Sequence, residues 1–123
     1  MGKVFTVGGY QTGTFQNWKG SFGFIKPDGE IRIFSLGGST TAGGDSSNEM
    51  HYPRQLEKMI GNPAVRIVNA GVPGYRSIHL LHYYKMVIRE FSPDIITIYS
   101  GWNDYDDYMM SYWKPRDPLG HAF

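Results

Sequence analysis

The feature that most constrains this chain is an apolar strand that ends at two glycines and a serine. Residues 31–36 read Ile-Arg-Ile-Phe-Ser-Leu, and Gly37, Gly38 and Ser39 follow directly. An apolar, β-branched run that stops at paired glycines predicts a buried strand with a tight turn at its end, because glycine tolerates positive φ and close backbone approach. The Ser39 hydroxyl would then project at the carboxyl end of the strand, where open α/β sheets bind ligands.

Strands and helices alternate after this turn. The pattern predicts a helix over residues 49–60, a strand over 65–70, a helix over 77–91 and a strand over 94–99. Alternation with short connections is typical of a parallel sheet with right-handed crossovers. The first helix is expected to place four apolar residues on one face: Tyr52, Leu56, Met59 and Ile60. The apolar positions of the second helix include Ile78, Leu81, Met86 and Ile88.

The third strand is almost wholly apolar, as expected of a strand that is covered on both faces. With the strand order 2-1-3 it lies at an edge of the sheet. An apolar edge strand is a template for pairing with another chain, so the sequence also predicts self-association through this strand.

Composition places the chain among ordinary globular proteins. Its 123 residues are 41% hydrophobic and 19% charged, with a formal net charge of +1, so there is no global electrostatic argument for binding nucleic acid or a membrane. The absence of cysteine excludes disulfides and thiol chemistry. No apolar segment approaches the roughly 18 residues of a membrane span, no signal peptide is visible, and nothing indicates a compartment.

Polar or glycine-rich turns follow all three strands. The second strand leads into Gly71-Val72-Pro73-Gly74, and the third leads into Gly101-Trp102-Asn103. Because the carboxyl ends of parallel strands share one edge, Ser39, Gly74 and Asn103 should converge there. Two backbone amides and one side-chain amide would form a three-donor oxyanion hole beside a serine nucleophile. Taken singly, each residue also suits a plain turn or a helix N-cap.

Together the three segments resemble the SGNH (GDSL-like) hydrolases, a family of serine esterases and lipases. The resemblance covers roughly residues 30–110: residues 37–43 match the first block, with Gly-Gly-Ser for the frequent Gly-Asp-Ser, residues 69–74 the second and residues 101–104 the third. It implies a three-layer α/β/α, flavodoxin-like parallel sheet. It also implies an ester hydrolase with Ser39 as the nucleophile, Gly74 and Asn103 as oxyanion donors, and no metal or organic cofactor.

The sequence departs from the family at the catalytic base. The family's histidine lies in an Asp-x-x-His block near the end of a longer domain, and that block is missing. His51, His79 and His82 fall in predicted helices, and His121 follows Asp117 by four residues rather than three. We therefore expect residues 31–123 to form a C-terminally incomplete SGNH domain after a lead-in segment, residues 1–30. An inactive fragment or binding remnant is the alternative function.

Aromatic residues near the third block favour an acylated carbohydrate over a lipid as the ester substrate, because such rings can stack on a sugar. They are Tyr75, Trp102, Tyr105 and Tyr108. No nucleic-acid or membrane partner is expected.

A less favoured alternative function lies in residues 13–34. Lys19–Ile25 reads Lys-Gly-Ser-Phe-Gly-Phe-Ile and resembles the aromatic strand with which cold-shock domains stack on single-stranded bases. The rest of that barrel is absent. A nucleotide triphosphatase is not favoured, because the phosphate loop of such proteins requires a lysine and residues 37–44 contain none.

Overall fold

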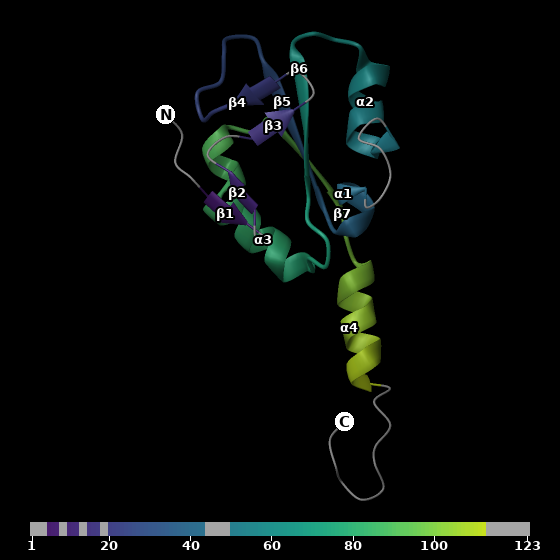
Figure 1. Ribbon diagram of the computed structural model, residues 1–123. Helices are drawn as coiled ribbons and strands as arrows, with labels where there is room; N and C mark the ends of the chain where they lie inside the picture. The colour runs from purple at the N-terminus through teal and green to yellow at the C-terminus, as the bar shows by residue number, and fades with distance from the viewer. Residues whose placement is uncertain (1–4, 8–9, 13–14, 18–19, 44–49, 113–123) are drawn as a thin grey trace, which may run out of the picture.

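The structure, a computed structural model, describes residues 5–7, 10–12, 15–17, 20–43 and 50–112 (Figure 1). Two short antiparallel hairpins come first, β1 (Phe5–Val7) with β2 (Tyr10–Thr12) and β3 (Phe15–Asn17) with β4 (Gly20–Phe22). The elements that follow are β5 (Ile31–Gly37), α1 (Ser39–Ala42), α2 (Tyr52–Ile60), β6 (Val65–Gly71), α3 (Ser77–Met86), the 3₁₀ helix η2 (Ile88–Phe91), β7 (Ile95–Tyr99) and α4 (Trp102–Tyr112). Within these ranges, no helix has the length and hydrophobicity needed to cross a bilayer.

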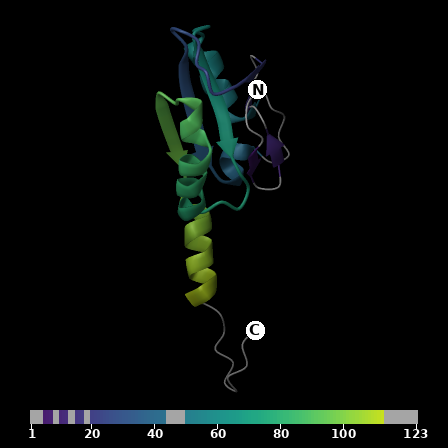
Figure 2. The ribbon, with the colours of Figure 1, turned by 90° about the vertical axis from the view of Figure 1, so that its left-hand side faces the viewer.

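The centre of the molecule is a parallel sheet with the order β6-β5-β7. Gly37 at the end of β5 lies opposite Gly71 of β6 and Tyr99 of β7, so the three carboxyl ends share one edge. Helices α2 and α3 lie on opposite sides of the sheet, and α4 extends away from its carboxyl edge (Figures 1 and 2). The predicted three-layer α/β/α architecture and the 2-1-3 strand order are confirmed.

Each face of the sheet has its own apolar core. The core beneath α2 contains Ile33, Val65 and Ile67, with Leu56 packed against it. The larger core beneath α3 contains Phe22, Phe34, Leu36, Val68, Ala70, Val72, Leu80, Tyr83, Val87, Ile88 and Phe91. Successive residues of a strand face opposite sides, which is why β5 supplies both cores and is buried from Arg32 to Gly37.

The predicted bounds of the two helices and the predicted apolar face of the first are partly wrong. Helix α2 begins at Tyr52, three residues later than expected, and buries Pro53 and Glu57, whereas Met59 is 84% exposed. Residues 45–48 read Asp-Ser-Ser-Asn, a sequence typical of a helix N-cap, but they lie outside the described residues. Helix α3 ends at Met86 and continues as the 3₁₀ turn η2, with Leu80 and Tyr83 as its buried positions. Of the four apolar positions named in this segment, Ile78, Leu81 and Met86 are exposed, and Ile88 is buried.

The two edges of the sheet differ. On β6, the Ile67 N–H donates to the Glu57 carboxylate at 2.9 Å, the Val65 N–H to the Asn62 carbonyl at 3.0 Å, and the Gly71 N–H to the Asn69 side chain at 3.0 Å. Side chains and a turn therefore occupy the edge of β6 where another strand would pair. The hydrogen bond from the Ile67 N–H to Glu57 also explains why Glu57 rather than Met59 faces inward.

Among the described strands, β7 pairs only with β5. Ile95, Ile98 and Tyr99 are exposed, so the expectation that this strand is covered on both faces is wrong for the described residues. Ile96 and Ile98 line an apolar groove of about 330 Å³ together with Leu36, Ser77, Leu80, Leu81 and Tyr84.

A buried arginine links the N-terminal segment to the sheet. Arg32 is fully buried in β5, and its guanidinium donates to the carbonyls of Gly23, Ile25 and Phe91 at 2.8–3.0 Å. It also pairs with Glu30 at 2.7 Å. Four acceptors around one planar fork are the arrangement that allows an arginine to be buried.

Glu30 is shared between two arginines, because Arg66 of β6 also lies 3.2 Å from its carboxylate. Burial raises the pKa of Glu30, but the hydrogen bonds from Arg32 and Arg66 outweigh burial and hold the pKa below its ordinary value. Both guanidinium groups also lie over the ring of Phe22, at 4.7 and 4.9 Å.

The aromatic residues of the segment that resembles a cold-shock strand pack in the core beneath α3. Phe22 packs edge-on against Phe34 and Phe91, and Phe24 lies 4.6 Å from Phe91 between ring centroids. Phe22 and Phe34 are buried, so these rings are not exposed for stacking on bases. Phe34 belongs to the parallel sheet rather than to a barrel.

Replacing Arg32 with methionine should lower the free energy of unfolding by about 3–5 kcal/mol, because the change leaves three carbonyls without their donor and Glu30 with Arg66 as its remaining arginine partner. Urea denaturation followed by circular dichroism measures the change. Arg89→Met is the matched control, since that side chain is 60% exposed, and it should change stability by less than about 0.5 kcal/mol. Equal effects of both substitutions would contradict the role given to Arg32.

Candidate active site

The turn that carries Ser39 lies directly on the strand ends because two glycines leave room for it. A Cβ atom on Gly37 would collide with the Thr41 side chain, and one on Gly71 with the backbone of Ala42. These glycines face each other on β5 and β6. Their lack of side chains brings α1 against the carboxyl edge and places Ser39, its first residue, at the surface.

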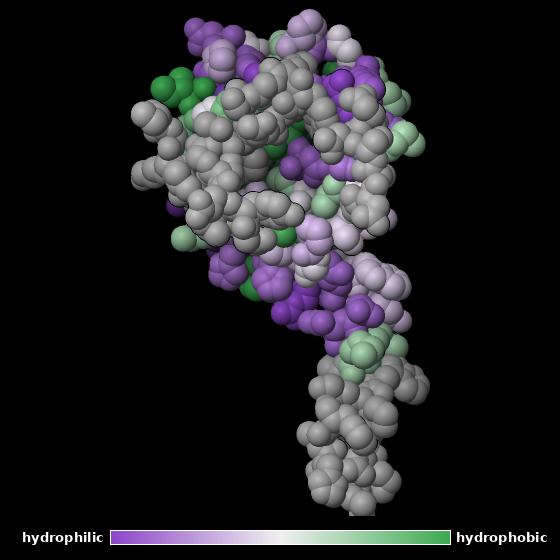
Figure 3. Space-filling model, in the orientation of Figure 1, coloured by the Kyte–Doolittle hydropathy of each residue, from purple (hydrophilic) through white to green (hydrophobic). Residues whose placement is uncertain are grey.

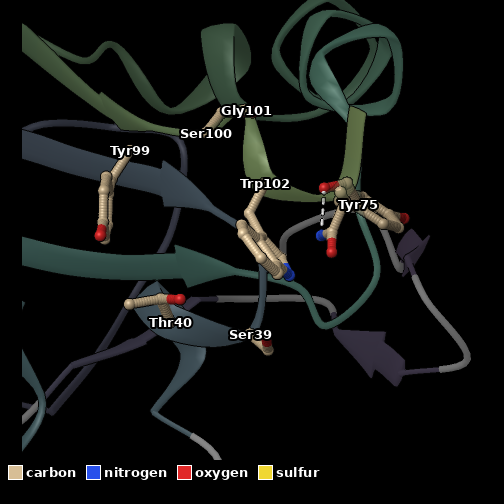
Figure 4. Close-up of a pocket in the computed structure, with 9 residues that line it drawn as sticks. Ser39, Thr40, Tyr75, Tyr99, Ser100, Gly101 and Trp102 are labelled. Atoms are coloured by element: carbon tan, nitrogen blue, oxygen red, sulfur yellow. Dashed lines mark hydrogen bonds between the residues drawn. The ribbon is translucent and has the colours of Figure 1, made fainter. Parts of the chain in front are cut away.

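Ser39 lines a small pocket of about 70 Å³ at this edge (Figure 4). The lining residues come from the β5–α1 turn, the loop after β6, and the end of β7 with the start of α4. They are Gly38, Ser39, Thr40, Tyr75, Tyr99, Ser100, Gly101, Trp102 and Asn103. The structure therefore brings the predicted nucleophile and the predicted side-chain oxyanion donor to one pocket.

The amide of Asn103 is held from two sides. Its Nδ2 donates to the Tyr75 carbonyl at 2.8 Å, and a Cβ atom on Gly38 would lie 2.7 Å from the same nitrogen. A side-chain NH₂ group carries two donors, one of which engages Tyr75. The absence of a side chain at position 38 thus allows the Asn103 amide to pack against the turn that precedes Ser39.

Gly74 lies beside the pocket but does not line it. It adopts φ +80° in the loop between β6 and α3, a conformation that favours glycine. The loop is anchored to β5 because the Val72 N–H donates to the Gly37 carbonyl at 2.9 Å, and it turns where the Tyr75 N–H donates to the Val72 carbonyl at 3.1 Å. Its next residue, Tyr75, reaches the pocket.

The histidines that the structure describes do not line this pocket. His51 is buried beside Gly43, with Nδ1 3.4 Å from the Asn69 amide. His79 accepts the Arg76 N–H at 3.0 Å and stacks on Tyr75, while His82 is exposed on α3. His121 lies outside the described residues.

The aromatic residues expected to contact a sugar take different positions. The ring of Tyr75 packs against Tyr83 and His79. Trp102 is 73% exposed, lines the pocket and lies 6.1 Å from Tyr105 between ring centroids. Tyr105 and Tyr108 are exposed on α4 outside the pocket lining. Among the described residues, no group of three or more acidic or histidine side chains could hold a metal ion.

A carboxylate that the sequence analysis did not single out connects α4 with α3. Asp104 accepts both the N–H and the hydroxyl of Ser77, and the shortest contact is 2.7 Å. The hydrogen bond from the Ser77 hydroxyl, followed by that from its N–H, holds the pKa of Asp104 below its ordinary value. An acidic residue in the first turn of a helix is a common sequence pattern, and it does not indicate a contact with a residue 27 positions earlier in the chain.

Comparisons with known proteins show the family and the fold of the chain. Residues 35–120 match the model of the GDSL-like Lipase/Acylhydrolase family, whereas a comparison with curated proteins found no match. The crystal structure of AlinE4, an SGNH-hydrolase family esterase, is similar with a TM-score of 0.57 and 28% identity, and covers 64% of this chain and 44% of that one.

A point variant of AlinE4 matches in the same way, with a TM-score of 0.57 and 28% identity over 63% of this chain and 43% of that one. A protein from Parabacteroides merdae ATCC 43184, assigned as a GDSL-like lipase, shares the fold with a TM-score of 0.51 and 23% identity, over 69% of this chain and 45% of that one. The chain spans less than half the length of these solved structures.

Gly38→Ala should displace the Asn103 amide and lower the free energy of unfolding by about 1–3 kcal/mol, because the added methyl group overpacks the turn. The side-chain NH₂ resonances of Asn103 in a ¹H–¹⁵N spectrum should shift, and urea denaturation measures the loss of stability. Gly23→Ala is the control, since an added Cβ there meets nothing within 4 Å. An unshifted Asn103 resonance in Gly38→Ala would contradict the close approach.

Proposed function

This chain belongs to the GDSL-like lipase/acylhydrolase family, and from that premise we propose that it carries the nucleophile and the oxyanion-binding groups of a carboxylic-ester hydrolase. One observation carries the proposal: Ser39 and Asn103 line the same pocket at the carboxyl edge of the sheet. The similarity to an SGNH-hydrolase family esterase supports it.

In the proposed reaction, the Ser39 hydroxyl oxygen attacks the carbonyl carbon of the ester while a base accepts its proton. Negative charge then develops on the carbonyl oxygen, and three N–H groups stabilise it: the backbone amides of Ser39 and Gly74 and the side chain of Asn103. Removal of one such donor typically lowers the rate by about 10²–10³-fold. The geometry around Gly38 favours this assignment because it keeps the Asn103 amide beside the Ser39 turn.

The tetrahedral intermediate collapses by breaking the bond to the alcohol oxygen, which takes the proton from the base. Water then attacks the acyl group on Ser39, gives a proton to the base, and the carboxylic acid leaves as the Ser39 hydroxyl is restored. By the family resemblance the base is a histidine of an Asp-x-x-His block, which this sequence lacks.

The proposed substrate is a short acyl ester, such as an acetyl ester, on a carbohydrate. The pocket of about 70 Å³ suits a small acyl group. Trp102 presents an exposed ring at its rim, and Tyr105 lies beside that ring, so the pair can stack on a sugar next to the scissile bond.

A binding module without catalytic activity is the second candidate. It is favoured by one observation, that none of the described histidines lines the pocket with Ser39. Without a base, a serine hydroxyl is a weak nucleophile at neutral pH. The chain alone should therefore hydrolyse a chromogenic ester little and react slowly with a serine-directed phosphonate.

The test of the nucleophile uses a version of the chain that carries a downstream Asp-x-x-His block. Ser39→Ala should lower turnover of p-nitrophenyl acetate by about 10⁶-fold, as loss of a serine nucleophile does in other enzymes. Ser100→Ala is the matched control, because Ser100 lines the same pocket, and it should retain most activity. Retention of more than a few per cent of activity in Ser39→Ala would refute the role of Ser39.

The chain without an added Asp-x-x-His block provides a complementary test when it is treated with the serine-directed phosphonate. Rapid, stoichiometric phosphonate labelling of Ser39 would show that residues 1–123 already supply a base, and His121 would be the first candidate. Slow labelling together with an active extended version would support the proposed function and locate the missing group outside this chain.

We also propose that a second copy of this chain pairs with the edge strand β7. Unprotected edge strands pair with other strands, and Ile95–Tyr99 contains no charge and no proline. The adjoining groove is lined largely by apolar side chains, so a paired strand would also bury apolar surface.

Ile98→Lys should reduce self-association of the chain, because a charge on an edge strand opposes pairing. Sedimentation velocity at micromolar concentrations should show species larger than a monomer for the unsubstituted chain and a shift towards monomer for the variant. Met59→Lys, at a position on α2 that is 84% exposed, is the control and should leave the distribution unchanged. If the unsubstituted chain sediments only as a monomer, the proposed self-association through β7 is refuted.

A further inference from the structure

Three consecutive residues before and at the start of α3 contact the first turns of α4. The pairs are the Tyr75 carbonyl with Asn103 Nδ2 at 2.8 Å, Arg76 Nη1 with Asp107 Oδ2 at 2.6 Å, and Ser77 with Asp104. Helix α4 otherwise extends away from the sheet (Figure 1). Its orientation, and therefore that of Asn103 at its start, depends on contacts near this end.

The contact between Asp104 and Ser77 is the most extensive of the three. The Ser77 N–H lies 3.1 and 3.0 Å from the two carboxylate oxygens of Asp104, and the Ser77 hydroxyl donates to Oδ1 at 2.7 Å. Ser77 is the first residue of α3, and the residue at the N-cap, Arg76, has no side-chain oxygen to accept the free amides of the first turn. Asp104, 27 residues later in the chain, accepts the amide of this first helical residue, one of the N–H groups that a helix N-terminus leaves without an intrahelical partner.

The charge of Asp104 suits this position. Carboxylates are favourable at helix N-termini, and Arg76 adds a positive charge nearby. Because hydrogen bonds from Ser77 lower the pKa of Asp104, the carboxylate is ionised at neutral pH. Its contribution to stability is present above the ordinary pKa of aspartate and is lost as the pH falls through the lowered value. Asp107 faces Arg76, and His79 accepts the Arg76 N–H in the same region.

These hydrogen bonds connect the start of α4, which carries Asn103, with the loop that carries Gly74. Asn103 directly precedes Asp104, and Gly74 lies three residues before Ser77. One bridge joins Asn103 to Tyr75 and the next joins Asp104 to Ser77, so two adjacent residues of α4 are fixed to one short segment. Asn103 cannot rotate away from the Gly74 loop while both bridges are intact.

We propose that Asp104 is a positioning residue for the oxyanion site: its bonds to Ser77 hold the start of α4, so that the Asn103 amide stays aligned with the loop that carries Gly74. The catalytic importance of this alignment rests on the proposed ester hydrolysis. The positioning itself does not, and it can be measured without turnover.

The first experiment follows the side-chain NH₂ resonances of Asn103 in the ¹H–¹⁵N spectrum of the chain, identified by their loss in Asn103→Ala. Asp104→Asn should move them towards the shifts of a solvent-exposed asparagine, because the bridge to Ser77 is weakened. Ser77→Ala removes only the hydroxyl donor and should cause a smaller shift in the same direction. It also serves if Asp104→Asn does not fold.

Two control variants separate positioning from a change of charge on the helix. Asp106→Asn removes the same charge from an exposed position on α4 and should leave the Asn103 resonances in place. Asp107→Asn breaks only the exposed pair with Arg76 and should shift them less than Asp104→Asn does. Equal shifts in Asp104→Asn and Asp106→Asn would overturn the proposal, as would unshifted Asn103 resonances when the Ser77 amide shows that its bond is lost.

The second experiment measures ester hydrolysis in the version with the downstream histidine block. Asp104→Asn should lower kcat by about 10- to 100-fold through misalignment of a catalytic group and leave KM within about twofold, the pattern of a lost transition-state interaction. An unchanged kcat would overturn the catalytic importance of Asp104. If Ser39→Ala is fully active while the Asn103 resonances respond to Asp104→Asn, the proposed function fails and the positioning stands.

Discussion

The arrangement of this domain depends on one guanidinium group inside the sheet. Arg32 is fully buried, and its donors are taken up by Glu30 and by carbonyls that lie before β5 and at the end of η2. A buried arginine is tolerated only when its donors are satisfied, so the folded sheet requires the carbonyls of Gly23, Ile25 and Phe91 around Arg32. The segment before the sheet and the turn before β7 are thereby fixed to the central strand.

The features that could be predicted from the sequence are those set by local pattern. Apolar β-branched runs located the three parallel strands, and the glycines after them located the turns. Strand ends in a parallel sheet share an edge for geometrical reasons, so the meeting of Ser39 and Asn103 at one pocket followed from the strand positions alone. The loop of Gly74 was located in the same way, although Tyr75 rather than Gly74 reaches the pocket.

The features that could not be predicted depend on partners far along the chain. Met59 looks like a core residue on its helix, yet Glu57 is buried in its place because the Ile67 N–H needs an acceptor. Arg32 sits in an apolar strand, and nothing in its neighbourhood in the sequence indicates the carbonyls that surround it. Asp104 caps a helix that begins at Ser77, and no local periodicity records such a contact.

The hydrogen bond between Glu57 and Ile67 also determines at which edge the sheet can accept a further strand. Because the buried Glu57 side chain of α2 accepts the Ile67 N–H at the outer edge of β6, a strand that paired there would have to displace that side chain. At the opposite edge, β7 pairs only with β5 among the described strands. Enlargement of this sheet is therefore one-sided, because a further strand would be added beyond β7 and not beside β6.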